Sequence, residues 1–207
     1  MKCFLLVTTI ALLATYIQTG NAIQLNCKFV TVANYPWGSI YECDATVVYD
    51  AQNVNRVTAV TGTHSSGKGN ADVHGLRIQS QKLDHFLVNI HKFFPNLKLL
   101  YFLSTSIPHI SNAHLLPLTN LEYLGLYNNS ITSLESNLFA GFESIKFITF
   151  SNNKIKHVGL DFILPNTAHL FDFSKNPCID MKAETPAQIT ELRQKLLVNC
   201  PPLNCCA

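Results

Sequence analysis

The chain has 207 residues, of which 47% are hydrophobic and 14% charged, and its formal net charge is +2 at pH 7. This near balance of basic and acidic residues gives no electrostatic reason to expect a nucleic acid or an anionic membrane as a partner. The sequence contains no block of five like charges and no low-complexity tract, so the length and composition favour one folded domain.

The first 22 residues are typical of a secretion signal. Lys2 supplies a positive charge, an apolar run follows over 4–14, and Gly20 and Ala22 place small residues before a cleavage site at Ile23. The apolar run is too short to cross a bilayer, and no other stretch is apolar enough to do so. We therefore expect an extracellular mature chain that begins near Ile23 and has no membrane span.

Residues 23–72 are expected to form an N-terminal cap. The segment from Cys27 to Cys43 alternates apolar and polar residues around a Pro36-Trp37-Gly38 turn, which is typical of a β-hairpin. A disulfide between the two cysteines would stabilise this hairpin by about 3 kcal/mol in the chain-entropy model. A further strand is expected over 57–61. It would lead into the first repeat.

The segment from Gly62 to Gly69 nearly matches a phosphate-binding P-loop. Its last position is a glycine, however, so the hydroxyl that would bind Mg²⁺ is missing. The residues that follow predict a strand, and not the helix whose N-terminus would bind phosphate. We therefore interpret the segment as a flexible loop between the cap and the first repeat.

Residues 73–177 show internal repetition. The pattern L-x-x-L-x-L-x-x-N-x-L occurs over 121–131 and again over 145–155. Steps of 24 residues, and one of 23, connect the turn positions of five repeats in register, which are Gln81, Thr105, Asn129, Asn153 and Asn176. A period of 20 to 29 residues is typical of leucine-rich repeats. The sequence therefore predicts an α/β solenoid with a parallel sheet on the concave side of an arc.

Each position in the repeat has a structural reason. The central L-x-L is expected to be a short strand, and the buried asparagine should bond backbone groups of its turn and of the next repeat. Because Gln81 and Thr105 replace the asparagine, we expect less regular turns in the first two repeats. Leu134, Phe139 and Phe142 should close the opposite side of the coil.

Residues 178–207 predict a helical cap. Thr185 is expected as the N-cap of a helix, with Pro186 in the first turn and Gln188 completing a capping box. The apolar face of this helix would comprise Ile189, Leu192, Leu196 and Leu197. A Cys178–Cys200 disulfide would fasten the helix over the last repeat, and Cys205 and Cys206 could link two chains into a homo-oligomer.

The chain resembles secreted leucine-rich-repeat proteins of insects, in particular short forms related to Toll-receptor ectodomains and to the leucine-rich immune proteins of mosquitoes. The residues that carry the resemblance are TGTHSSGKGNADVHGLRIQSQKL, FFPNLKLL and SKNPCID. The resemblance implies a recognition protein without enzymatic activity. It also implies binding through the sheet face and suggests innate immunity as a setting.

The concave sheet face is the candidate binding surface, because alternate residues of each strand point there. The residues expected to contact a partner are Arg77, Leu99, Tyr101, Leu103, Tyr123, Tyr127, Phe147 and Thr149. Aromatic residues are enriched where partners dock, so a protein or glycan ligand is expected. The alternative for the face is that cap residues cover it. The alternative for the function is a matrix component that self-associates.

Asn128-Asn129-Ser130 is a glycosylation sequon, and a glycan on Asn128 would border the concave face. The eight histidines lack metal-ligand spacing. His64, Ser65 and Asp72 are too loosely spaced to predict a catalytic triad. We therefore expect no catalytic residue, no metal and no cofactor.

Overall fold

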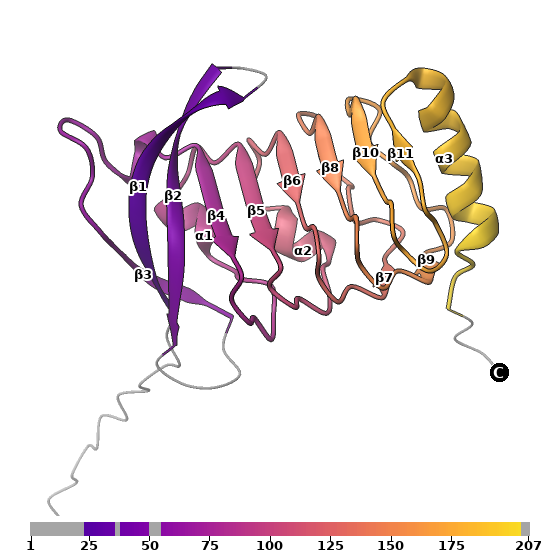
Figure 1. The fold of residues 1–207 in the computed structure, drawn as a ribbon, viewed down its shortest axis with the longest axis horizontal. Coiled ribbons are helices and arrows are strands. Elements are labelled where there is room, and N and C mark those ends of the chain that lie inside the picture. The colour runs from indigo at the N-terminus through magenta and orange to yellow at the C-terminus, as the bar shows by residue number, and fades with distance from the viewer. Residues whose placement is uncertain (1–22, 36–37, 50–54, 204–207) are drawn as a thin grey trace, which may run out of the picture.

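The computed structural model describes residues 23–35, 38–49 and 55–203. The expected signal segment 1–22, the first two residues of the Pro36-Trp37-Gly38 turn, and Cys205 and Cys206 lie outside the described residues. One large sheet runs through the described chain, with the strand order β11-β10-β8-β6-β5-β4-β2-β1-β3. A long hairpin lies at one end of this sheet and a helix at the other (Figure 1).

The N-terminal cap is a hairpin with one added strand. β1 (Ile23–Tyr35) pairs antiparallel with β2 (Gly38–Tyr49), and the Cys27–Cys43 disulfide joins them as predicted. The hairpin is longer than the segment between these cysteines. β3 (Val57–Thr61) forms where the sequence predicts it, but it pairs parallel with β1 at the outer edge of the sheet.

The segment after β3 contacts the cap through His64, and its interpretation as a flexible loop stays a prediction. The His64 ring stacks on Phe29 with 3.7 Å between the ring centroids. Its Nδ1 lies 3.1 Å from the Tyr41 hydroxyl and its Nε2 lies 2.9 Å from the Asn70 side-chain oxygen. A short 3₁₀ turn, η1 (Asn70–Asp72), then leads into the first repeat.

Five parallel strands form the repeats. They are β4 (Gly75–Gln79), β5 (Leu99–Leu103), β6 (Tyr123–Gly125), β8 (Phe147–Thr149) and β10 (Leu170–Asp172). Leu100 pairs with Leu76 on one side and with Leu124 on the other, which is the register that the 24-residue period predicts. The inward residues of all five strands are fully buried. This arrangement fits a leucine-rich-repeat arc.

The opposite side of the coil contains short elements and buried apolar side chains. α1 (Ile90–Phe93) and α2 (Asn112–Leu115) lie behind the sheet in Figure 1. β7 (Ser133–Leu134) and β9 (His157–Val158) pair with each other in a separate two-stranded sheet. As predicted, Leu134 and Phe139 are buried there and Phe142 packs against the core.

The turn asparagines join neighbouring repeats, but to the previous repeat and not to the next one. The Asn153 amide donates to the Leu126 carbonyl at 2.7 Å and to the Phe150 carbonyl at 2.9 Å. Its oxygen accepts the Ile131 backbone N–H at 3.1 Å. Because the side chain points back along the solenoid, each asparagine completes the turn that was formed before it.

The first two turns are more regular than expected. The residue before the turn position is left-handed in every repeat, at φ between 54° and 57°, and these residues are Ser80, Ser104, Asn128, Asn152 and Lys175. Thr105 is fully buried and donates its hydroxyl to Asn129 at 2.8 Å. Gln81 donates to the Ala45 carbonyl at 2.8 Å. Thr105 and Gln81 therefore form hydrogen bonds to a neighbouring strand or repeat at the positions where they replace asparagine. Ser106 adds a second left-handed residue in the second repeat.

The C-terminal cap closes the other end. β11 (Lys182–Ala183) pairs antiparallel with β10, and α3 (Pro186–Asn199) begins with the predicted Thr185 capping box. The Cys178–Cys200 disulfide is present. Leu192 and Leu196 are buried, whereas the assignment of Leu197 to the apolar face is wrong, because this side chain is 51% exposed. It lies one residue, about 100° of helix rotation, beyond Leu196.

We expect Asn153→Ala to destabilise the protein by about 3 kcal/mol, because it leaves the Ile131 N–H and the Leu126 carbonyl without their buried partner. Asn152→Gly is the matched control, since it removes the neighbouring amide and keeps the left-handed backbone. It should change the free energy of unfolding by less than about 1 kcal/mol. Denaturant unfolding of both variants measures the difference. Equal losses would contradict the structural role assigned to Asn153.

Candidate binding surface

The concave face brings together most of the residues that the sequence predicts for binding. Tyr127 is exposed, and the half-buried members of the predicted set are Arg77, Tyr101, Leu103, Tyr123, Phe147 and Thr149. The prediction that Leu99 contacts a partner is wrong, because this side chain is fully buried and offers no surface to a partner. Its neighbours in the sheet are Gly75, where the Glu42 side chain packs, and the larger Tyr123.

Three aromatic side chains cross the middle of this face. We call Tyr101, Tyr123 and Phe147, from the neighbouring strands β5, β6 and β8, the aromatic row. The ring centroids are 4.8 Å apart between Tyr101 and Tyr123, and 5.6 Å apart between Tyr123 and Phe147. The Arg77 guanidinium lies over the Tyr101 ring, 4.6 Å from its centroid. Such contacts stabilise ring positions beyond area burial alone.

Gly125 makes room for the aromatic row. A Cβ atom at this position would stand 2.2 Å from Cδ1 of Tyr101, which is far inside van der Waals contact. The Tyr101 ring therefore lies against the backbone of the next strand. Desolvation by this burial raises the pKa of the Tyr101 hydroxyl above its ordinary value, and the neighbouring Tyr123 adds to the shift. The hydroxyl stays neutral.

A polar network fixes the end of the row beside the hairpin. Glu42 is a buried carboxylate that accepts the Tyr35 hydroxyl at 3.0 Å and pairs with the Arg77 Nε at 3.2 Å. Arg77 also donates to the Tyr35 oxygen at 2.8 Å. Burial, with a contribution from Glu42, raises the pKa of Tyr35 to about 12. The hairpin tip is thus bonded to Arg77, so the cap contacts this end of the face.

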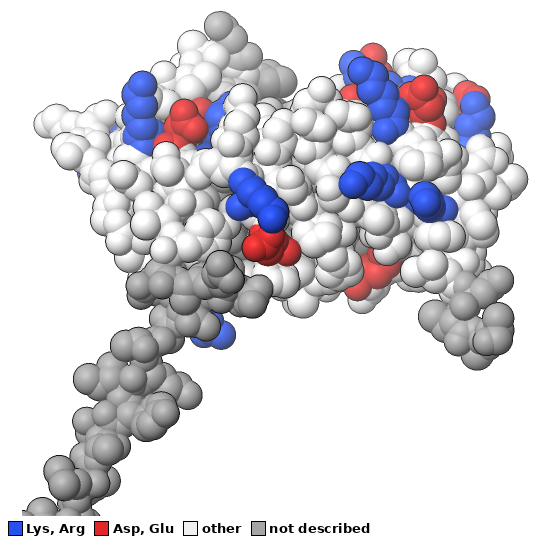
Figure 2. Space-filling model, turned by 60° about the horizontal axis from the view of Figure 1, so that its bottom comes forward, with Lys and Arg blue, Asp and Glu red and all other residues white. Residues whose placement is uncertain are grey.

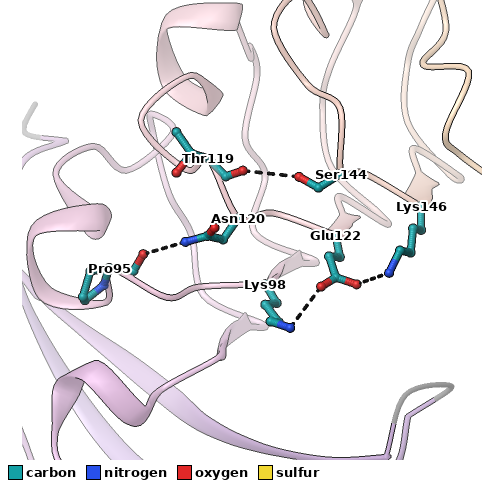
Figure 3. Close-up of polar contacts among 7 residues, drawn as sticks. All are labelled: Pro95, Lys98, Thr119, Asn120, Glu122, Ser144 and Lys146. Atoms are coloured by element: carbon teal, nitrogen blue, oxygen red, sulfur yellow. Dashed lines mark hydrogen bonds and ion pairs between the residues drawn. The ribbon is translucent and has the colours of Figure 1, made fainter.

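The strand-start edge of the face contains a charged group that the sequence analysis missed. Lys98, Glu122 and Lys146, one from each of three successive repeats, form what we call the lysine edge (Figure 3). Glu122 pairs with Lys98 at 3.1 Å and with Lys146 at 2.5 Å. Desolvation alone would raise the pKa of Glu122, but the hydrogen bonds from both lysines outweigh it and the pKa is lowered.

The signal that could have found the lysine edge is the same 24-residue spacing that identified the repeats. Its members occupy one repeat position, directly before the first outward residue of the strand. Beside them, the Asn120 amide donates to the Pro95 carbonyl at 3.2 Å and the Ser144 hydroxyl donates to the Thr119 carbonyl at 3.3 Å (Figure 3). The backbone that supports the edge is therefore joined between repeats as well.

The opposite edge of the face contains the sequon. Asn128 is exposed in a left-handed turn, where it donates to the Ser104 hydroxyl at 2.8 Å and accepts from the Asn152 amide at 2.7 Å. The side chain thus lies on the surface and belongs to a polar ladder along the turns. The tight turn does not hide it.

Other candidate sites carry no recognisable chemistry. Both ring nitrogens of His64 have partners other than Ser65 or Asp72, so no triad forms. No cluster of histidine, cysteine or acidic residues in the described parts of the chain could hold a metal ion.

A hollow of about 370 Å³ lies on the convex side, where Phe139, Phe142 and Ile163 line it. Charged side chains in the view of Figure 2 are scattered in small groups and form no single-sign patch.

No family model matches this chain. No curated protein matches it significantly. Among solved structures, it is similar to the leucine-rich-repeat ectodomain of the receptor kinase SOBIR1 from Arabidopsis thaliana, at 16% identity and a TM-score of 0.42. That alignment covers 72% of this chain and 79% of the ectodomain.

Within the helices that the structure describes, none has the length and apolar character to cross a membrane.

Gly125→Ala should displace the Tyr101 ring and destabilise the protein by about 2 kcal/mol, because the added methyl group occupies the place of the ring. Adding Tyr101→Ala to this variant should remove the clash, so the second substitution should cost less in the Gly125→Ala background than in the wild-type chain. Thermal unfolding and near-ultraviolet circular dichroism measure both effects. Gly69→Ala is the control, since nothing lies within 4 Å of its added methyl group. Additive effects of the two substitutions would contradict the contact.

Proposed function

We propose that the chain is a secreted, non-enzymatic recognition protein that binds a protein or glycan partner through its concave face. The observation that carries the proposal is the aromatic row, which places three half-buried rings on neighbouring strands of one rigid sheet. Aromatic residues presented on a surface are enriched at the centres of interfaces. Residues on strands are also positioned more accurately than residues on loops.

The proposed location is extracellular. Two disulfides, one in each cap, support it, because such bonds persist in oxidising compartments. The resemblance to insect immune proteins makes innate immunity the proposed setting. The alternative of a self-associating matrix component depends on Cys205 and Cys206, which lie outside the described residues. The exposed side chains of Val198 and Leu203, just before them, are the surface that would support it.

Replacing Tyr101, Tyr123 and Phe147 together by alanine should abolish capture of the partner. The measurement is affinity capture from the extracellular fluid of the source organism, with mass spectrometry and then titration of the captured ligand. The matched control replaces Leu116, Leu160 and Ile163, three exposed apolar residues away from the concave face, by alanine. Circular dichroism confirms that both variants fold. Capture that survives loss of the aromatic row would refute the proposed binding face.

Asn128 is expected to carry an N-linked glycan when the chain is secreted from insect cells, because it is exposed and its amide lies on the surface. Asn128→Gln and Ser130→Ala should both remove the glycan, and both should increase mobility on a gel to the position reached by enzymatic deglycosylation. Asn152→Gln is the control, since the neighbouring asparagine of the ladder has no sequon. Identical mobility of the wild-type and Asn128→Gln chains would show that the site is unused.

A further inference from the structure

We propose that the partner is a protein segment that presents apolar side chains to the aromatic row and carboxylates to Lys98 and Lys146. The inference rests on the proposed function and states the chemistry of the ligand at that face. It follows from two observations: how the rings of the row are packed, and how the charges of the lysine edge are exposed.

Each ring of the aromatic row has one face that packs within the protein. The Tyr123 and Phe147 planes are 24° apart with centroids 5.6 Å apart. Two coplanar neighbouring rings would need more than about 6 Å, given carbon contacts of about 3.5 to 4 Å, so these faces overlap. Tyr101 lies between the Arg77 guanidinium and the backbone at Gly125. Every ring of the row therefore has a covered face.

The aromatic row and the lysine edge together distinguish between the two classes of ligand. A neutral sugar has no carboxylate for Lys98 and Lys146. A protein segment can supply apolar side chains to the aromatic row and carboxylates to the lysines at once. A protein segment is therefore favoured over a glycan.

The lysine edge has unused capacity for anions. The Lys98 and Lys146 side chains are 44% and 43% exposed, whereas the Glu122 side chain between them is 14% exposed. Both carboxylate oxygens are occupied by the lysines. Each ammonium group has three N–H donors and donates one to Glu122. The group therefore carries a net positive charge and has N–H donors left for an anion.

The spacing of these charges defines the segment further. The ammonium groups of Lys98 and Lys146 contact the two oxygens of one carboxylate, at 3.1 Å and 2.5 Å, so they lie within about 8 Å of each other. An extended chain rises about 3.3 Å per residue and its alternate side chains share a face, so acidic residues two positions apart, about 6.6 Å, would reach both lysines. The inferred ligand combines this acidic spacing with apolar residues that contact the aromatic row.

The probe is a displayed library of random short peptides, selected on the full-length secreted chain, in parallel with an array of glycans. We expect the selected peptides to combine Asp or Glu with aliphatic or aromatic residues, and their binding to weaken as salt is raised to about 0.5 M. Lys98→Gln with Lys146→Gln should weaken binding at low salt by about fivefold. Glu122→Gln should tighten it, which a purely structural role for Glu122 would not do.

Lys154→Gln with Lys156→Gln is the charge-matched control, since these lysines are exposed outside the lysine edge. It should leave binding unchanged. Selected peptides without carboxylates, an unchanged affinity in the Lys98 and Lys146 variant, or binding to glycans in place of peptides would overturn the inference. If loss of the aromatic row still abolishes peptide binding while loss of the lysines does not, the proposed function stands and the inference fails. If neither loss matters, both fail.

Discussion

The hydrogen bonds of the buried turn asparagines set the arrangement of the whole repeat region. Each amide satisfies the backbone of its own turn and of the turn before it, as Asn153 does with Phe150 and Leu126. A buried backbone group without a partner is costly, so the turns can stack in only one register. That register is one repeat per strand, and it places equivalent residues of successive repeats side by side. Both the aromatic row and the lysine edge are consequences of it.

The aromatic row shows how a regular fold produces an individual surface. The same repeat position is occupied by Gly75, Leu99, Tyr123, Phe147 and Leu170 in successive strands, and only Tyr123 and Phe147 offer rings. Tyr101 joins them from another position because Gly125 leaves its place on the sheet empty. The rings then pack against each other. The selectivity of the face thus comes from side-chain packing on a backbone that is nearly the same in every repeat.

The two caps differ in what they do to the concave face. The C-terminal cap closes the last repeat with β11, α3 and a disulfide. The N-terminal hairpin does more, because Tyr35 and Glu42 hold Arg77 in place over Tyr101. A buried ion pair of this kind positions a side chain more than it stabilises the fold. The hairpin therefore belongs to the binding surface as well as to the cap.

The sequence predicts the features that depend on local pattern or on residue type. These are the period of the repeat, both cap disulfides, the α3 capping box and the direction of most concave residues. The period could also have found the lysine edge, but three features could not be read. The direction of the asparagine bonds, the burial of Leu99 and the packing of the segment around His64 depend on which side chains meet across neighbouring parts of the fold. A pattern along one strand specifies which residues face outward. How much of each remains exposed is decided by the neighbouring strands, and only the tertiary structure brings those strands together.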